Sequence, residues 1–398
     1  MIMKNLLWLI LLLAGLSAAQ AENISMAKVQ NLNRYEINAK FLPGNNKVLL
    51  ILGQDLYSLS EYVDSGYFPE PAGVTTYLAF YSLLNSSFPA FGALGQDING
   101  DSADNVDWGA GPVNAWKTAT LFTQSSIAIG LNIAEGSGNY LWAKGGLADI
   151  GVGAYDDHIR HLAKFCKSIN NSIFLRIGYE FDGSWNSGYE KKTSYILAFR
   201  RIVDVMREEG VSNVAYVWQA SASPIDDLID GHHENIANWY PGNDYVDWIG
   251  MSWFLPPDVR INNAPSQRDL ADEVLNFARN NRKPAMIAEA SPQGYDLMEL
   301  TNANISPLWD GEAGKNVQHK TPLEIWQEWF VPFFDYIHTN NDVVRAVAYI
   351  NADWDGQLKW SAPYSEGYWG DSRVQMNSVI RKLWLQQTGD YSFWSTGN

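Results

Sequence analysis

Residues 173 to 181 read Ile173-Phe-Leu-Arg176-Ile-Gly-Tyr-Glu180-Phe181, a short apolar run that carries two charged side chains. A run of this length with little polar alternation is typical of a parallel strand buried on both faces. Seven further runs, rich in β-branched or aromatic residues, recur along the chain. The eight expected strands are Val48–Gln54, Gly73–Leu83, Ser126–Ala134, Ile173–Phe181, Val214–Ala220, Trp248–Phe254, Ala285–Ala290 and Val344–Asp353.

Segments with helical periodicity lie between these runs. The clearest are Tyr155–Ile169, Thr193–Glu209, Gln267–Arg282, Leu323–Thr339 and Val374–Gln387, and weaker ones follow the first, second and fifth strands. Strand followed by helix, eight times and with no break in composition, predicts an α/β fold: one (β/α)8 TIM barrel. A doubly wound open sheet is the alternative, but no glycine-rich phosphate-binding sequence follows any of the runs.

Composition excludes several classes of protein. Of the 398 residues 46% are hydrophobic, which supports a sizeable core, and the net charge is −16 with no Lys/Arg run. That charge is wrong for binding nucleic acid, since affinity for a polyanion comes from basic side chains. Cys166 is the only cysteine, so an intrachain disulfide and a cysteine-based zinc site are both excluded. We expect Cys166 to be a buried residue of an amphipathic helix.

The N-terminal segment has the three parts of a secretory signal. Lys4 precedes an apolar run from Leu6 to Leu16, and the segment ends in Ala19-Gln-Ala21. The run is shorter than the ~20 residues that span a bilayer. We therefore expect a signal peptide over residues 1–21, a catalytic domain over 22–389, a tail over 390–398, and a secreted or periplasmic protein without a membrane anchor.

The longest insertion runs from Asn85 to Val113, after the second strand, and is rich in Gly, Asp and Asn. Loops of this length in a compact domain are usually functional or mobile. Asp97-x-Asn99-x-Asp101 starts like a calcium-binding loop, but Ser102 and Trp108 stand where that loop needs Gly and a bidentate Glu. A polar turn is therefore favoured, and no metal is predicted.

Two glutamates stand near the ends of the fourth and seventh runs, Glu180 and Glu289. The carboxyl ends of barrel strands meet at one face, where active sites of this fold lie. Apolar neighbours raise the pKa of a carboxyl group, as a general acid requires, and two such groups facing one another are the parts of a glycosidase. The structural alternative is a carboxylate paired with an arginine, and Arg176 is placed to pair with Glu180 because both would face the same side.

At these residues the chain resembles glycoside hydrolase family 26. Arg176-x-x-x-Glu180-x-Asp182-Gly183-x-Trp185 is similar to the family's Arg-Pro-x-His-Glu-Met-Asn-Gly-x-Trp segment, with Tyr179 in place of the His. The resemblance is closer to the β-1,3-xylanase branch and extends from about Leu49 to the last helix. It rests on Gly53-Gln54-Asp55, Pro71–Thr75, Tyr179-Glu180, Glu289–Gln293, Tyr349–Asp355 and Pro363–Arg373.

The resemblance implies a retaining hydrolase in which Glu180 is the acid/base and Glu289 the nucleophile. Retention requires the two carboxyl groups to lie about 5–5.5 Å apart. On the sixth strand the wider clan often supplies a Tyr hydroxyl near the nucleophile, whereas this chain has Ser252-Trp253-Phe254. No cofactor is implied.

Aromatic residues at the expected strand ends predict a sugar-binding groove, because flat rings pack against the C–H faces of pyranoses. Trp326 and Trp329 lie on one helical face and are expected in the core instead. The residues expected to bind substrate are Gln54, Trp108, Arg176, Tyr179, Trp185, Trp218, Gln219, Trp253, Gln293, Asp353, Trp354 and Trp369.

The expected partner is a polysaccharide or oligosaccharide, bound by a monomer. Two alternatives to β-1,3-xylan hydrolysis remain: a family relative that acts on β-mannan or a β-glucan, and a catalytically dead glycan-binding barrel. A dead barrel predicts the loss of a catalytic carboxylate, and both Glu180 and Glu289 are present. Sulfated galactans are disfavoured because an acidic protein repels them.

Overall fold

The computed structural model describes residues 37–80, 91–96, 100–136, 146–260, 264–303, 317–361 and 369–397. The expected signal peptide, residues 1–21, and part of the insertion after the second strand lie outside these ranges. Within the described part of the chain, no helix combines the length and the hydropathy needed to cross a bilayer.

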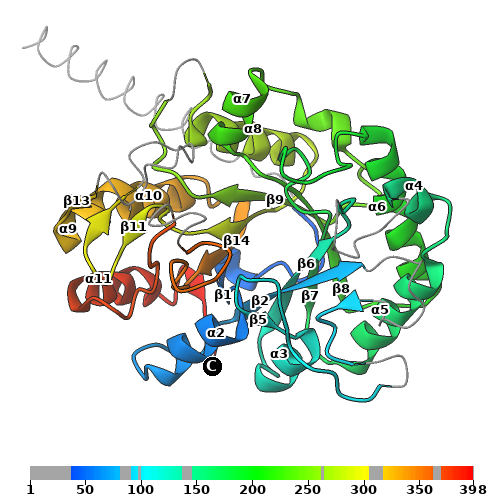
Figure 1. Ribbon diagram of the computed structural model, residues 1–398, viewed down its shortest axis with the longest axis horizontal. Coiled ribbons are helices and arrows are strands. Elements are labelled where there is room, and N and C mark those ends of the chain that lie inside the picture. Colours follow the sequence, from blue (N-terminus) through cyan, green and yellow to red (C-terminus); the bar gives the residue numbers. More distant parts are fainter. Residues whose placement is uncertain are drawn as a thin grey trace, which may run out of the picture. The chain divides into compact units, whose positions relative to one another are not determined.

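Eight parallel strands form a closed barrel, which confirms the predicted fold. Each strand pairs with the next one along the chain, and β1 pairs with both β2 and β14 to close the ring (Figure 1). Several strands end sooner than predicted, so that Glu180 and Asp353 lie in the loops that follow β7 and β14. The barrel strands are β1 (Val48–Gly53), β2 (Gly73–Phe80), β6 (Ser126–Asn132), β7 (Ile173–Ile177), β8 (Val214–Ala220), β9 (Trp248–Trp253), β10 (Ala285–Ala290) and β14 (Val344–Ile350).

Helices cover the outside of the barrel (Figure 1). Polar side chains begin several of them: Asp55 accepts hydrogen bonds from the first turn of α2, and Ser266 forms a reciprocal capping box with Asp269 on α8. The helices are η1 (Gly44–Asn46), α2 (Leu56–Asp64), α3 (Ala115–Leu121), α4 (Gly146–Gly151), α5 (Asp156–Ser168), α6 (Lys192–Glu208), α7 (Pro224–Asp230), η2 (Ile236–Trp239), α8 (Gln267–Asn280), α9 (Pro322–Ile325), the π-helical turn η3 (Trp326–Phe330), α10 (Val331–Thr339) and α11 (Ser378–Thr388).

Three predictions about buried residues are confirmed by this helical layer. Cys166 on α5 is fully buried, and burial raises the pKa of its thiol to about 12, so it is an inert core residue. Trp326 and Trp329, in the π-helical turn, are also buried, and the ring of Trp329 stacks on Phe333.

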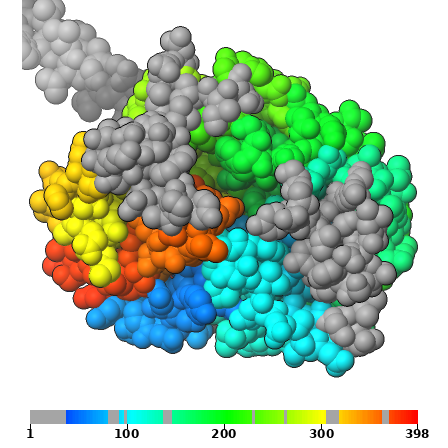
Figure 2. Space-filling view, viewed as in Figure 1, coloured from blue at the N-terminus to red at the C-terminus, as the bar shows by residue number. Residues whose placement is uncertain are grey.

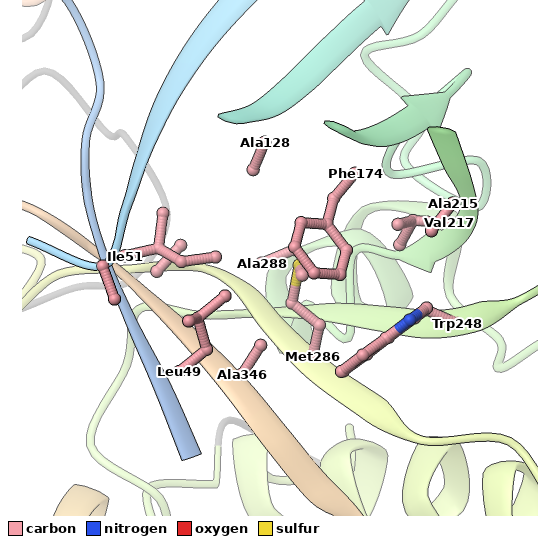
Figure 3. Close-up of a cluster of buried hydrophobic side chains, with 12 residues drawn as sticks. Leu49, Ile51, Ala128, Phe174, Ala215, Val217, Trp248, Met286, Ala288 and Ala346 are labelled. Carbon is pink, nitrogen blue, oxygen red and sulfur yellow. The ribbon is translucent and has the colours of Figure 1, made fainter. Parts of the chain in front are cut away.

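The interior of the barrel is filled by alternate residues of its strands. Figure 3 shows this cluster, in which side chains from β1, β6, β7, β8, β9, β10 and β14 meet. Phe174 and Trp248 contribute the large rings, which cross at 90° with centroids 5.1 Å apart, and alanines fill much of the remaining space. Because side chains alternate along a strand, the next inward positions toward the carboxyl end belong to Arg176, Gln219 and Ser252. A polar layer therefore lies above the apolar core.

Two insertions carry short strands of their own. The expected loop after β2 contains β3 (Phe91–Gly92), which pairs antiparallel with the end of β2. It also contains a hairpin of β4 (Val106–Asp107) and β5 (Pro112–Val113). A second insertion, which the sequence did not reveal, follows β10. It contains the antiparallel strands β11 (Tyr295–Asp296), β12 (Thr301–Asn302) and β13 (Gln318–His319).

The predicted C-terminal tail, residues 390–398, is instead part of the barrel's packing. In it, β15 (Trp394–Ser395) pairs in parallel with the start of β1. The Trp394 side chain is fully buried and packs at an angle against Phe334. A segment too short for a domain therefore supplies an edge strand and one large apolar anchor.

Candidate active site

The polar layer at the carboxyl end of the barrel contains one of the two predicted catalytic residues, Glu289, on β10. Strict alternation would point Glu289 outward, since Met286 and Ala288 of the same strand face the interior. The register with β9 shifts at this point: Ile287 pairs with Met251, and Glu289 with Ser252. Two residues of β10 thus advance for one of β9, which is a β-bulge, and the bulge turns Glu289 into the barrel.

Arg176 on β7 is fully buried and forms an ion pair with the largely buried Glu289. Its Nη1 also donates to Gln219 Oε1 at 3.0 Å. The rings of Tyr77 and Tyr179 lie 5.1 and 5.2 Å from the guanidinium carbon and pack edge to face against each other, with centroids 5.5 Å apart. Arg176 therefore partners Glu289 and not Glu180, which corrects the structural alternative considered for Glu180.

A glycine on the neighbouring strand makes room for this arginine. A Cβ atom at Gly130 of β6 would lie 2.6 Å from the Tyr77 ring and 2.9 Å from Arg176 Nη2. Both distances are shorter than side chains tolerate, so a larger residue at position 130 would displace the guanidinium or the ring. The position of Arg176, and with it that of Glu289, depends on the missing side chain of Gly130.

Glu180 lies in the loop after β7, in a left-handed conformation with φ of 53°. Its Oε1 accepts a hydrogen bond from Ser252 Oγ at 2.7 Å, and its Oε2 accepts one from Trp185 Nε1 at 2.9 Å. Asn186 Nδ2 donates to the Glu180 carbonyl and fixes the loop. Burial, and next the negative charge of Glu289, raise the pKa of Glu180 to about 8, while the bonds from Ser252 and Trp185 lower it.

Hydrogen bonds connect the two glutamates through buried side chains. Ser252 contacts Glu180, Gln219 Nε2 donates to Ser252 Oγ at 3.1 Å, and Arg176 joins Gln219 to Glu289. The site therefore pairs a carboxyl group that holds its proton at neutral pH with a carboxylate held by an arginine. Carboxyl groups whose environments differ in this way can act as acid and nucleophile.

The structure overturns two of the predicted sugar-binding tryptophans. Trp218 and Trp253 are fully buried. Trp218 stacks on Phe181, with ring centroids 4.3 Å apart, and Trp253 packs against Phe333 and Tyr336. Each is the strand neighbour of an inward residue, so alternation points its ring outward into the layer between strands and helices. Neither ring is available to a substrate.

Gln219 is also reassigned. Both ends of its amide are used inside the protein, by Arg176 and Ser252, and the side chain is fully buried. It therefore positions other residues and does not orient a sugar hydroxyl.

Three tryptophans gather in the loop after β14. Trp354 is buried, donates through Nε1 to Ser372 Oγ, and stacks on Trp369 with centroids 4.8 Å apart. Trp369 is half-buried, and Trp360 packs against it at 5.0 Å. Trp354 therefore supports the ring of Trp369, which corrects its prediction as a direct sugar contact.

Several other predicted substrate contacts keep surfaces or polar groups available. Trp185 is 48% exposed beside Glu180, and Trp108 and Tyr179 are half-buried. Gln54 and Gln293 are buried, and Gln293 Nε2 has no hydrogen-bond partner among the described residues. Their roles in binding stay predictions.

Asp353 is engaged in the protein, which reduces its capacity to bind sugar. Its carboxylate lies 3.3 Å from Arg373 and accepts a hydrogen bond from the Gly356 amide. As for metals, no three His, Cys, Asp or Glu side chains of the described chain are grouped to hold an ion. Asp97 and Asn99 of the calcium-like motif lie outside the described residues.

Three residues near the glutamates were missed by the sequence reasoning: Ser252, Tyr77 and Lys359. Alternation along β9 would have revealed Ser252, because it stands four residues after the inward-facing Trp248. Lys359 had no such signal, since it lies in a loop. Its amide donates to the carbonyl of Gly109 at 2.7 Å, so the segments after β14 and β2 meet, as the orange and cyan surfaces of Figure 2 show.

The ammonium group of Lys359 lies 4.6 Å from the centre of the Trp360 ring. Desolvation lowers the pKa of Lys359, and the charges of Glu180 and Glu289 act in the opposite direction. Lys359 therefore brings a positive charge toward the two carboxyl groups.

A (β/α)8 barrel with one glutamate after its fourth strand and another on its seventh, linked at the carboxyl face, has the site architecture of a glycoside hydrolase. Comparison with known proteins agrees. The sequence model of glycosyl hydrolase family 26 matches residues 152–321. A β-1,3-xylanase of an Alcaligenes species is 34% identical over 352 residues, covering 88% of this chain and 65% of that protein. A β-1,3-xylanase of a Vibrio species is 34% identical over 361 residues, covering 90% and 68%.

The chain therefore belongs to glycosyl hydrolase family 26. It spans about two thirds of the length of these two relatives. Among solved structures, the Bacillus subtilis mannanase man26 is similar with a TM-score of 0.51 and 14% identity, over 89% of this chain and 88% of that one. At that identity the likeness concerns the fold alone.

Proposed function

We propose that this protein is an exported, endo-acting β-1,3-xylanase that hydrolyses its substrate with retention of configuration. The substrate is suggested by the two relatives that bear this name. The observation that carries the catalytic assignment is the unequal pair of carboxyl groups: Glu289 in a buried ion pair with Arg176, and Glu180 with a pKa raised to about 8.

In the first step Glu289 attacks the anomeric carbon as the glycosidic C–O bond breaks. Glu180 transfers its proton to the departing oxygen, so the leaving sugar departs as a neutral alcohol. Burial keeps Glu180 protonated at neutral pH, as this step requires. Arg176 holds the Glu289 carboxylate in position.

In the second step Glu180, now a carboxylate, takes a proton from water. The oxygen of that water attacks the anomeric carbon, and the bond to Glu289 breaks, which restores both groups. Retention needs the carboxyl groups about 5–5.5 Å apart, and a short separation is supported by the charge of Glu289, which is the second largest cause of the raised pKa of Glu180.

Half-exposed rings provide surfaces for the glycan. Trp185 is next to Glu180 and Trp369 is braced by Trp354, so each can present a ring to a sugar. The same site is also compatible with hydrolysis of a different β-glycan, because the two glutamates do not select the linkage that is cleaved. A dead binding barrel is disfavoured, since both carboxyl groups are present and joined by hydrogen bonds.

Export is proposed from the N-terminal segment, in which Lys4, the run Leu6–Leu16 and the Ala19-Gln-Ala21 ending form a secretory signal. Mass spectrometry of the protein recovered from periplasm and medium tests it. We expect a chain that begins near Glu22; an intact Met1 in the recovered protein would contradict export by cleavage.

Reducing-sugar release by the purified protein tests the substrate. β-1,3-Xylan, β-1,4-xylan and β-1,4-mannan are compared in parallel, with Glu289→Gln as the inactive control. Release from β-1,3-xylan alone is expected. Release from another glycan by the wild type and not by the control would keep the catalytic pair and discard the substrate.

A further inference from the structure

Three buried polar side chains lie between Glu289 and Glu180, and each belongs to a different barrel strand. Arg176 and Gln219 are fully buried and Ser252 is 1% exposed. The hydrogen bonds run from Arg176 to Gln219 at 3.0 Å, from Gln219 to Ser252 at 3.1 Å, and from Ser252 to Glu180 at 2.7 Å. Solvent therefore supplies none of these contacts.

The direction of these hydrogen bonds is fixed by chemistry. A guanidinium group can only donate, so the amide oxygen of Gln219 must face Arg176 and its NH2 group must face Ser252. Ser252 Oγ consequently accepts from Gln219, and its single proton is left for Glu180 Oε1. Each member thus donates to the next, and the last acceptor is the carboxyl group of Glu180.

Neighbouring glycines show that the barrel is built to hold this arrangement. A Cβ atom at Gly250, the partner of Gln219 on β9, would lie 2.9 Å from Gln219 Cβ and 3.1 Å from its Cγ. The absent side chain leaves the space in which Gln219 reaches Ser252, two residues further along the strand. Gly130 makes the same allowance for Arg176 at the other end.

We infer that Ser252, oriented by Gln219, is a positioning residue for Glu180: it donates its proton to Oε1 and so fixes the carboxyl group with Oε2 turned toward Trp185. Oε2 accepts the hydrogen bond from Trp185 Nε1 at 2.9 Å, and the Trp185 ring is 48% exposed, so Oε2 is the oxygen on the side open to a substrate. The inference rests on the proposed role of Glu180 as acid/base.

Two consequences separate this role from simple packing. A hydrogen bond donated to a carboxylate stabilises its charged form, so Ser252 lowers the pKa of Glu180 against the effect of burial. Loss of the hydroxyl should raise that pKa by about one unit. It should also let the carboxyl group of Glu180 rotate away from its observed position, so proton transfer to a poor leaving group slows.

The test measures the titration of Glu180 directly in Ser252→Ala, Ser252→Thr and Gln219→Glu. Carbon NMR of protein labelled at glutamate carboxyls gives the midpoint, with the Glu180 signal identified by its absence in Glu180→Gln. Ser252→Thr keeps the hydroxyl and is the matched control. Gln219→Glu replaces the amide donor by an acceptor, so Ser252 is no longer oriented toward Glu180, and the added negative charge also raises the pKa of Glu180. Ser252→Ala, which adds no charge, is therefore the deciding variant. Circular dichroism confirms that each variant is folded.

We expect a midpoint near 8 in the wild type and in Ser252→Thr, and a midpoint about one unit higher in Ser252→Ala and Gln219→Glu. The midpoint pH of the basic limb of kcat/KM should shift by the same amount as the titration midpoint of Glu180. An unchanged midpoint in folded Ser252→Ala would overturn the inference. Because the titration needs no substrate, its result stands apart from the proposed function, which fails separately if the wild type hydrolyses no glycan.

Discussion

Glu180 and Glu289 are the same residue type at the same end of one barrel, yet their surroundings differ in every respect that controls a carboxyl group. Glu289 is on a strand, turned inward by a bulge, and paired with the buried cation Arg176. Glu180 is in a loop, in a left-handed conformation, and its carboxyl oxygens accept hydrogen bonds from the neutral donors Ser252 and Trp185.

The difference shows how one protein obtains an acid and a nucleophile from two identical side chains. Glu289 has a cation as its hydrogen-bond partner, whereas Glu180 is buried with neutral donors, so desolvation dominates there and raises the pKa of Glu180 to about 8. The negative charge of Glu289 adds to this effect on Glu180.

The largest effect is expected from Glu289→Gln, which keeps the volume of the side chain and a hydrogen-bond acceptor for Arg176 but removes the nucleophile. Turnover should fall by several orders of magnitude on every substrate, whatever its leaving group, because the first bond cannot form. Steady-state kinetics checks this, and a thermal unfolding curve close to that of the wild type shows that the loss is chemical. Near-normal turnover would remove Glu289 from its assigned role.

Glu180→Ala should behave differently, since only poor leaving groups need its proton. Hydrolysis of polysaccharide should drop by about 10²–10⁴-fold, while bond cleavage in an activated aryl glycoside should be largely retained. Added azide sharpens the contrast: it should yield a β-glycosyl azide with Glu180→Ala and an α-glycosyl azide with Glu289→Ala. Equal losses on both substrates would argue against the acid role.

Gly130→Ala tests whether the catalytic activity that depends on Glu289 requires the observed position of Arg176. The new Cβ would lie 2.6 Å from Tyr77 and 2.9 Å from Arg176, so the guanidinium should shift. A displacement of this order near a reacting group costs roughly a hundredfold in kcat/KM. Gly44→Ala is the matched control, because nothing lies within 4 Å of its Cβ. Equal activity in the two variants would show that Arg176 tolerates movement.

The basic limb of the pH dependence of kcat/KM reports on Glu180. Its pKa is raised, and the protonated form is the acid, so kcat/KM should be flat just below pH 8 and fall about tenfold per unit above it. A profile measured on a natural glycan checks the midpoint. A fall that begins near pH 5 would mean that Glu180 is ionised at neutrality and cannot serve as the acid.

The smallest effect is expected from Trp185→Phe, which removes the donor to Glu180 Oε2 and keeps a flat ring. Because Trp185 is half-exposed, loss of its hydrogen bond should raise the midpoint pH of the basic limb of kcat/KM by less than about one unit. KM should change little. A large loss of kcat with an unmoved limb would indicate that the indole binds the substrate and does not act on Glu180.

Much of the fold and the identity of the glutamates could be predicted from the sequence, because apolar runs and helical periodicity are local signals. The eight apolar runs predicted the barrel, and the positions of Glu180 and Glu289 at the ends of the fourth and seventh runs predicted the catalytic pair. The bulge in β10 could not be predicted, since an extra residue in one strand is visible only against its neighbour on β9. The partner of Arg176 depends on that bulge, so the sequence alone offered Glu180 as the alternative partner and could not indicate Glu289.

The tryptophans show the same limit. Trp218 and Trp253 stand at strand ends, which is the position expected of sugar-binding residues, but the direction of a side chain is decided by one step of alternation. In each case the neighbouring residue, Gln219 or Ser252, faces the barrel and the indole faces the helices. The buried Trp394 was missed for a different reason, because its strand pairs with residues at the other end of the chain.

The most direct test of the assignment is to trap the glycosyl-enzyme. A fluorinated xylobiosyl fluoride, which forms the covalent intermediate but releases it slowly, is incubated with the wild-type protein, and the labelled peptide is sequenced by mass spectrometry. We predict one added glycosyl group, attached to Glu289. A label on Glu180 or elsewhere, or no label in protein that hydrolyses β-1,3-xylan, would contradict double displacement through Glu289.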